Sequence, residues 1–282
     1  GEAGVSTSSL EELARLAVDG DGGALASLVE QLESPVFSLC VRMLGSVQDA
    51  EDASQDILVK VVTHLGSFEG RSAITTWVHR IAVRHVLSLK RSRAEERSLD
   101  ESGFAGLLQR GLEYSGSQPA PSPEHLALVA EVRLSCTQGM LMMLSRKERL
   151  ALVLVDLLGF NSAEAAEVSD VSHDAFRQRL SRARSRLGGF LEAQCGLANE
   201  SAPCRCERQI PGKMALGLTP AKQKLTPLSR GDLRVTEDAE LALSEMKSVH
   251  RIASAFHPGG AYAAPERLHA RMMQLLPTVL RE

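Results

Sequence analysis

One stretch of the chain, residues 68–93, limits its fold and function more than any other. Its sequence is FEGRSAITTWVHRIAVRHVLSLKRSR, and from Ile74 onward apolar side chains recur at the spacing of one helix face. The opposite face carries a basic ridge, formed by Arg80, Arg84 and Arg91 and extended by Lys90 and Arg93. Arginine can donate two N–H groups to one phosphate, so this ridge suits a polyanion. A solvated surface helix is the plainer interpretation of the same charges.

The turn before this helix favours nucleic acid as the polyanion. It is small and polar, it contains Gly70 and the hydroxyl residues Ser72 and Thr75, and it joins Phe68 to Trp77. Such a turn can accept an unstacked base between aromatic and hydroxyl groups, as proteins that bind single strands do. The segment therefore predicts a contact with an opened strand.

The same residues resemble a known family. FEGRSAITTWVHRIA, preceded by VFSLCVRMLGSVQDAEDASQDILVKVV, resembles region 2 of bacterial RNA polymerase sigma factors, in particular the small extracytoplasmic-function (ECF) type. The resemblance implies that this helix and its turn open the −10 promoter element and capture a flipped base. The residues assigned to this contact are Ser72, Thr75, Thr76, Trp77, Arg80 and Arg84, with Arg91 on the same ridge. Arg84 stands where the family often has a smaller polar residue such as Asn.

The remaining helices of the first predicted domain, residues 1–97, follow from caps and apolar spacing. Ser9 can cap a first helix, which the sequence DGDGG ends. A second helix carries Leu25 to Leu32, and Pro35 is expected to open a third helix that Gly45 ends.

Ser46 caps the next helix, whose polar face is acidic. That face carries Asp49, Asp52, Gln55 and Asp56. By itself such a face indicates a solubilising surface. The family resemblance implies that this helix docks on the coiled-coil clamp of the largest polymerase subunit, where its acids would pair with basic residues.

Residues 98–123 are predicted to form a flexible acidic linker. They contain several glycines and the run SGSQPAPSP, a composition that resists packing. The resemblance adds that such linkers pass through the polymerase cleft near the RNA exit path.

A second predicted domain covers residues 124–192 and has the order of a helix-turn-helix. A helix begins near Pro123, Ser145 and Glu148 form a capping box, a short helix starts at Ser162, and Ser172 caps a last helix running to about Leu191. The segment LSRKERLALVLVDLLGFNSAEAAEVSDVSHDAFRQRLSRARSRL resembles region 4 of the same family, which binds the −35 element. Asp170 stands where the family commonly has Gly before the turn.

The last helix of this domain carries the candidate contacts to duplex DNA. Phe176, Leu180, Ala183 and Leu187 fall on one narrow core stripe, and five arginines face a single acid, Asp174, on the rest of the helix. Arg reads guanine and Gln reads adenine in the major groove, so the candidates for base contacts are Arg177, Gln178, Ser181 and Arg182. The arginines nearer the core margins, Arg179, Arg184 and Arg186, are expected to meet phosphates.

A C-terminal extension, residues 193–282, goes beyond the two sigma regions. Cys195, Cys204 and Cys206 cluster in it near arginines, a pattern suited to zinc or to a redox switch. Zinc would need a fourth ligand, for which Cys136 and His173 are candidates; a loop that merely contains cysteines is the alternative. Amphipathic helices are expected at about 237–256 and after Pro265, packed on the chain itself or acting as a built-in regulator in place of an anti-sigma protein.

Taken together, these patterns predict an all-α protein that is not an enzyme. There is no strand pattern, no glycine-rich phosphate loop and no HExxH motif. The expected partners are core RNA polymerase and promoter DNA, with an anti-sigma factor as a further candidate. No signal peptide or membrane partner is expected, and the five cysteines do not suggest a disulfide framework, so the cytoplasm is the expected compartment. Two rival hypotheses are a free-standing helix-turn-helix regulator and a metal or redox sensor acting through the cysteine tail.

Overall fold

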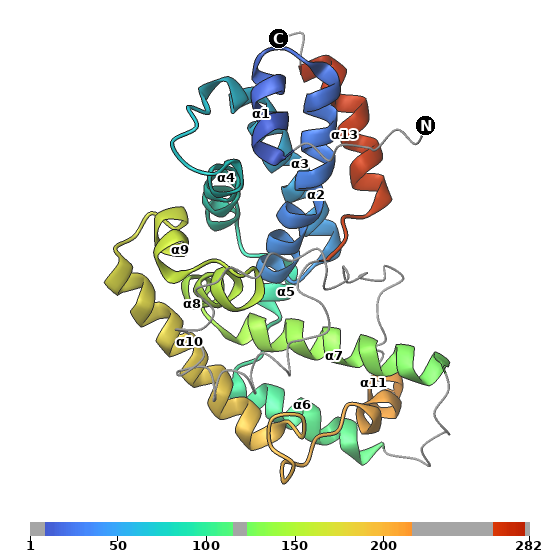
Figure 1. The fold of residues 1–282 in the computed structure, drawn as a ribbon. Helices are drawn as coiled ribbons and strands as arrows, with labels where there is room; N and C mark the ends of the chain where they lie inside the picture. The colour runs from blue at the N-terminus through green and yellow to red at the C-terminus, as the bar shows by residue number, and fades with distance from the viewer. Residues whose placement is uncertain (1–8, 115–122, 216–261, 280–282) are drawn as a thin grey trace, which may run out of the picture.

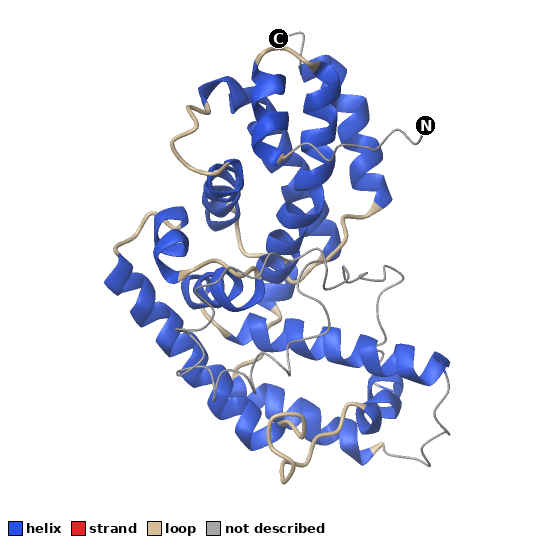
Figure 2. Cartoon of the chain, viewed as in Figure 1, coloured by secondary structure: helices blue, strands red, loops and turns tan. Residues whose placement is uncertain are grey.

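Helices account for the fold of the part of the chain that the structure describes (Figure 2). The computed structural model describes residues 9–114, 123–215 and 262–279. Its elements in chain order are α1 Leu10–Val18, α2 Gly22–Leu44, α3 Val47–His64, the 3-10 turn η1 Leu65–Ser67, α4 Ile74–Ser88, α5 Arg93–Glu96, α6 Glu101–Glu113, α7 Pro123–Met143, α8 Arg146–Leu152, the π-helical turn η2 Val153–Leu157, α9 Ser162–Val168, α10 His173–Gln194, the 3-10 turn η3 Glu207–Gln209, α11 Ile210–Ala215 and α13 Glu266–Val279. No strand occurs within those ranges, which confirms the all-α prediction.

The first four helices form a bundle with α13, shown at the top of Figure 1. Helix α2 is its centre, because α1, α3, α4 and α13 all pack against α2. Among the described helices, α2 alone is long and apolar enough to cross a membrane by length and composition, but 67% of its apolar window is buried inside the protein, as in a core helix.

Proline 35 does not divide this segment into two helices, contrary to the prediction from the sequence. Helix α2 runs through it to Leu44 and ends at Gly45, whose φ of 73° is the left-handed value that glycine adopts most easily. A proline inside a helix costs about 3 kcal/mol. Here the residues on both sides of it, including Leu32 and Val36, are fully buried in one core, and that packing outweighs the loss.

The region 98–123 also differs from the prediction. Helix α6 occupies much of it, with Asp100 accepting a hydrogen bond from the Gly103 backbone as its N-cap. Phe104 and Leu108, one turn apart, are buried, and the Phe104 ring lies 5.6 Å from that of Phe190 on α10. The glycines of this stretch suggested flexibility, but the spaced apolar residues anchor a helix on the second domain.

The second domain is assembled from α6 to α11, and it touches the bundle. Helix α10 runs along the outer side of this lower half in Figure 1, while α9 lies beside α4, and α7 and α8 contact α2. The predicted capping box of Ser145 and Glu148 and the Ser172 cap are both present. Helix α13 confirms the helix predicted after Pro265; the helix predicted at 237–256 lies outside the described residues.

Candidate nucleic-acid interface

Helix α10 presents a polar face to solvent because its apolar stripe is buried. Phe176, Leu180, Ala183 and Leu187 all lie in the core, as predicted. The four residues proposed to contact bases, Arg177, Gln178, Ser181 and Arg182, are all exposed. Arg182 Nη2 donates to Gln178 Oε1 over 3.4 Å, so these two side chains lie next to each other on the surface. The exposed face of α10 is therefore polar and carries two arginines next to an amide side chain.

Two other arginines of α10 have partners inside the protein. Arg184 binds Asp156 of the π-helical turn η2, with Nη2–Oδ1 and Nε–Oδ2 distances of 2.7 and 3.1 Å. Arg186 pairs with Glu101 and Glu148 at 3.0 and 3.3 Å. Arg179 is partly buried. A phosphate contact by Arg184 would require its pair with Asp156 to open, so the structure gives this arginine a bracing contact that the sequence did not reveal.

The turn between α9 and α10 adopts a left-handed backbone at one residue. Asp170 has a φ of 55°, the one positive value among non-glycine residues in the described ranges. Aspartate is among the few residues that tolerate this conformation. Asn161 caps α9 in a capping box with Glu164, which sets the short helix ahead of the turn. Helix, turn and helix thus follow in the predicted order.

The second candidate surface is the turn before α4. The rings of Phe68 and Trp77 lie 5.6 Å apart and tilted by 54°, and Gly70 has a φ of 69°. Ser72 in the turn and Thr75 and Thr76 in the first turn of α4 are partly buried. Trp77 packs against the bundle core, so the aromatic pair is held on a rigid element. The predicted base-accepting residues therefore lie together at one end of α4.

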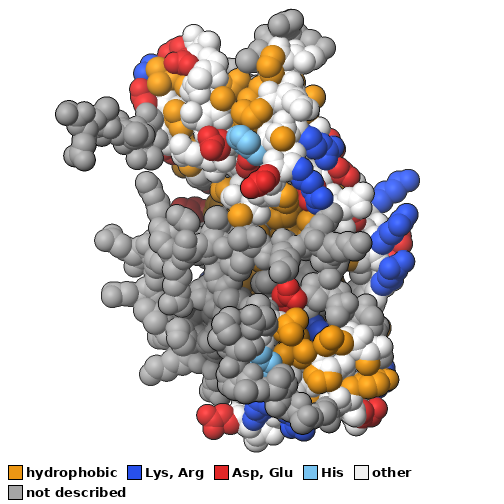
Figure 3. All heavy atoms as spheres, turned by 90° about the vertical axis from the view of Figure 1, so that its right-hand side faces the viewer, with side chains coloured by type: hydrophobic (Ala, Val, Ile, Leu, Met, Phe, Trp, Pro, Cys, Tyr) orange, Lys and Arg blue, Asp and Glu red, His pale blue; other side chains and the backbone are white. Residues whose placement is uncertain are grey.

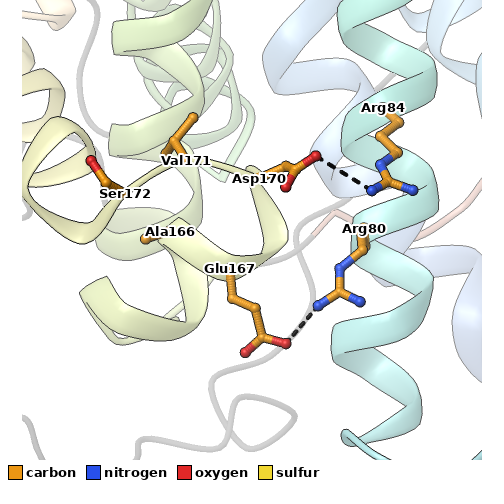
Figure 4. Close-up of a pocket in the computed structure, with 7 residues that line it drawn as sticks. All are labelled: Arg80, Arg84, Ala166, Glu167, Asp170, Val171 and Ser172. Carbon is orange, nitrogen blue, oxygen red and sulfur yellow. Dashed lines mark hydrogen bonds and ion pairs between the residues drawn. The ribbon is translucent and has the colours of Figure 1, made fainter.

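The arginines of α4 face the helix-turn-helix (Figure 4). Arg80 Nη2 lies 2.5 Å from Glu167 Oε1 on α9, and Arg84 Nη2 lies 3.5 Å from Asp170 Oδ2 in the turn. They line an open groove of about 480 Å³ between the two domains. Helix α4 ends at Ser88, so Arg91 lies beyond it, exposed. The domain contact supplies both of these acids from residues far along the chain, where local sequence spacing does not reveal them.

A buried ion-pair cluster joins the same two domains, and it was missed at the sequence level. Glu95 on α5 accepts hydrogen bonds from Arg146 and Arg149 at the start of α8, at 2.5–2.9 Å. The side chains of Glu95 and Arg149 are 2% and 3% exposed. Arg149 also donates to the backbone carbonyls of Met43, Leu141 and Leu144. Burial alone would raise the pKa of Glu95, but hydrogen bonds from Arg146 and the Ser92 backbone, with the two arginine charges, lower its pKa to about 2.

The acidic face of α3 contacts both α4 and α13. Asp56 lies 3.7 Å from His85 Nε2 on α4, and burial, together with the Lys60 charge, lowers the pKa of His85. Asp52 lies 3.3 Å from Arg271 of α13. Asp49 and Gln55 are partly buried. The four predicted polymerase contacts lie on one helix, and α13 reaches one of them.

The cysteines of the extension pack near α7. The backbones of Cys195 and Cys204 pair in an isolated bridge, and Cys206 packs on the cluster of Val129, Val132 and Ile210. Cys136 lies close enough to these three cysteines that a thiolate at any of them would raise the pKa of Cys136. Burial raises the pKa of Cys204 to about 11 and that of Cys136 to about 12, which disfavours the reactive thiolate. His173 instead contacts Ser162, at 2.8 Å.

No zinc site is formed by these side chains in the structure. Among the described residues, no group of three or more His, Cys, Asp or Glu side chains is arranged to hold a metal ion. Zinc at the cysteines therefore stays a prediction, which metal analysis of the purified protein would check.

Comparison with known proteins matches both domains. The model of Sigma-70 region 2 matches residues 28–96, and that of Sigma-70, region 4 matches residues 134–187. The ECF RNA polymerase sigma factor SigG of Mycobacterium tuberculosis (strain CDC 1551 / Oshkosh) is 32% identical over 193 residues, covering 63% of this chain and 51% of SigG. SigW of Bacillus subtilis (strain 168) is 27% identical over 172 residues, covering 60% of this chain and 89% of SigW. A solved structure of CnrH in complex with the cytosolic domain of CnrY has a TM-score of 0.47 and 23% identity, covering 64% of this chain and 96% of that one.

The two matched regions, in this order along one all-α chain, define a sigma-70 type protein. The chain carries sigma-70 region 2 and region 4 in this order and is similar to ECF RNA polymerase sigma factors. It spans about half the length of the SigG relatives that it matches. The predicted family is thereby confirmed, and neither matched region includes the C-terminal extension.

Proposed function

We propose that this chain binds core RNA polymerase and directs it to promoters, with α4 at the −10 element and α10 at the −35 element. The observation that carries the proposal is the exposed polar face of α10, with Arg177, Gln178, Ser181 and Arg182 opposite a fully buried stripe. A helix-turn-helix places such a face in the major groove. The two matched sigma-70 regions and the similarity to ECF sigma factors support the same assignment.

The turn before α4 would hold a base taken out of the duplex. Phe68 and Trp77 offer apolar ring surface, while Ser72, Thr75 and Thr76 offer hydroxyl groups for the base edge. Stacking on aromatic rings contributes about 1–3 kcal/mol per base in proteins that bind single strands. The arginines Arg80, Arg84 and Arg91 would then meet the phosphates of the opened strand.

The polymerase would bind the acidic side of α3, through Asp49, Asp52, Gln55 and Asp56. Carboxylates there would pair with basic side chains on the enzyme and guide docking by charge. In this proposal the chain catalyses nothing itself, acts in the cytoplasm and needs no cofactor, because the polymerase performs the chemistry. An anti-sigma factor is a further candidate partner.

The test is co-purification with bacterial core RNA polymerase, followed by run-off transcription from a promoter library. Stable binding with specific starts is expected. The variant Arg177→Ala/Arg182→Ala should lose −35 selectivity but still bind core, since its changes lie on the DNA face. Arg110→Ala on α6 removes an exposed arginine away from both DNA surfaces and is the matched control. Duplex binding by the protein alone, with no binding to core, would support a free-standing regulator instead.

A further inference from the structure

Helix α13 lies on the bundle although it is far from the bundle in sequence. It packs against α2 and α3, and residues 216–265 separate it from α11 in the sequence. Leu268 and Met272, four residues apart, are 0% and 1% exposed, and Leu276 continues the same buried stripe. Tyr262, ahead of the helix, is also buried, and the Arg42 guanidinium lies 4.5 Å from its ring centroid. One apolar stripe therefore holds α13 on the bundle.

Charge complementarity sets the position of α13 on this surface. Arg267 makes a two-point ion pair with Glu51 of α3, and Arg271 lies 3.3 Å from Asp52 of the same helix. His269 Nδ1 lies 3.1 Å from Glu33 Oε1 on α2. The bundle contributes the acids and α13 the basic side chains at every one of these contacts. Acidic and basic side chains both appear on the bundle when the molecule is viewed from this side (Figure 3).

The bundle surface is thus a docking site for a basic amphipathic helix. Its requirements are an apolar stripe at four-residue spacing and cations placed to meet Glu33, Glu51 and Asp52. Asp52 is also one of the proposed polymerase contacts, so α13 and the polymerase would share it. A carboxylate paired with Arg271 is not available to a basic residue of the enzyme.

We infer that α13 is a tethered competitor for the polymerase-binding surface of this chain. The inference rests on the function proposed above and adds an intramolecular control to it. Because α13 belongs to the same chain, its docking is an intramolecular event and needs little intrinsic affinity. The side chains of Arg267 and Arg271 remain 47% and 46% exposed in their ion pairs, so salt or a competing basic surface can displace them. The alternative is a permanent structural role, in which α13 is simply another helix of the bundle.

The first experiment weakens docking from the α13 side and leaves the bundle unchanged. Met272→Asp places a charge in the buried stripe, and Arg267→Glu/Arg271→Glu reverses the cations that meet Glu51 and Asp52. Gln274→Glu, at an exposed position of the same helix, is the control for added negative charge. The measurement is the apparent Kd of each full-length protein for bacterial core RNA polymerase. If the docked state of α13 is about ten times as populated as the undocked state, both release variants, Met272→Asp and Arg267→Glu/Arg271→Glu, should bind core about tenfold more tightly than the wild type.

The outcomes separate the inference from the function on which it rests. Equal affinity of the wild type, the control and both release variants would overturn the competition and leave the proposed function standing. Absence of core binding by every protein would instead remove the proposed function, and the competition with it. Weaker binding by the release variants would show that α13 supports the bundle rather than blocking it.

A second experiment supplies α13 as a separate peptide to a release variant whose binding to core shows that it is folded. A peptide of residues 262–282 is added to the complex of core polymerase with the Met272→Asp protein. Competition predicts that the peptide displaces this protein from core in a dose-dependent manner. The same peptide with Arg267 and Arg271 replaced by Glu should displace it at least about tenfold less effectively, since the two charged contacts are reversed. No displacement by the unmodified peptide would overturn the inference.

Discussion

Helices α4 and α10 are the two proposed DNA-contacting helices, and the structure treats them differently. On α10, Arg177 and Arg182 are exposed and no acid pairs with them among the described contacts. On α4, Arg80 and Arg84 each pair with an acid of the helix-turn-helix domain. Arg177 and Arg182 of α10 are thus free of acidic partners among the described residues, whereas the two arginines of α4 are engaged by the neighbouring domain across an open groove. Promoter opening at the −10 element would therefore require the two domains to separate, whereas contact with the −35 element would not.

The ion pairs between the two domains are of two kinds. Glu95, Arg146 and Arg149 form a buried cluster, while the pairs of Arg80 with Glu167 and Arg84 with Asp170 lie at the surface. Buried charges are costly when one partner is lost, whereas exposed pairs contribute about 1 kcal/mol or less. The cluster should therefore hold the domains together, and the surface pairs should only adjust access to α4.

The largest expected effect comes from breaking the buried cluster with Glu95→Gln. Two arginines then lose their shared counter-ion, one of them almost fully buried, so we expect a loss of about 3–5 kcal/mol in unfolding free energy. Urea unfolding followed by circular dichroism measures it. Glu96→Gln, at the exposed neighbouring position, is the control and should change stability little. Equal stabilities of the two variants would show that the cluster does not hold the domains.

The same cluster predicts a dependence of stability on pH. The pKa of Glu95 is about 2 in the folded protein, below its ordinary value of 4.5, so the folded state binds the proton more weakly than the unfolded state. Its contribution is complete above about pH 4.5 and is lost as the pH falls toward 2. Between about pH 4.5 and pH 2, the free energy of unfolding should therefore fall less steeply with decreasing pH for Glu95→Gln than for the wild type. Parallel curves would contradict the assigned pKa.

Replacement of Arg184 and of Arg177 on α10 by alanine should have different effects. Arg184→Ala leaves the largely buried Asp156 carboxylate without its partner, so we expect a loss of about 1–3 kcal/mol of stability. Arg177→Ala should leave stability unchanged and weaken holoenzyme binding to −35 duplex DNA by about 1–3 kcal/mol, the usual contribution of a base contact. Thermal unfolding and fluorescence anisotropy measure the two effects. A loss of stability with Arg177→Ala would contradict its assignment to the DNA face.

The difference between α4 and α10 shows which structural features local sequence signals can predict and which they cannot. Local signals sufficed for α10: the Ser172 cap and the spacing of Phe176 and Leu180 predicted its start and its buried side, and hence its exposed side. The partners of Arg80 and Arg84 were invisible, because they are more than 80 residues away and depend on domain docking.

Two further differences have the same origin. Pro35 signals a helix start by local rules, yet burial on both sides of it keeps α2 continuous. Glu95 follows the basic ridge in the sequence, and only the tertiary structure shows Arg146 and Arg149 bound to it. Long-range ion pairs and the position of α13 depend on which faces meet, which local periodicity does not determine.

A smaller effect is expected from opening the surface pairs with Glu167→Gln/Asp170→Asn. Each pair contributes about 1 kcal/mol or less, so stability should change little and affinity for a single-stranded −10 oligonucleotide should rise no more than about fivefold per pair. The measurement is oligonucleotide binding to the holoenzyme assembled with bacterial core polymerase. Glu200→Gln/Glu207→Gln removes two exposed acids of the extension and is the charge-matched control. If the control raises affinity equally, net charge and not release of α4 is responsible.

The smallest effect is expected at the turn itself, where Asp170 both pairs with Arg84 and adopts a φ of 55°. Asp170→Gly removes an exposed ion pair but relieves the side-chain clash of the left-handed backbone, so the two changes nearly cancel and stability should move by less than about 0.5 kcal/mol. Asp170→Ala removes the same pair and keeps a Cβ atom, which costs about 1 kcal/mol in this conformation. Urea unfolding of the wild type and the two variants separates the contribution of the ion pair from that of the left-handed backbone. Equal stability of the Gly and Ala variants would mean that the backbone of the turn relaxes out of the left-handed region, and Asp170 would then matter only through its charge on α4.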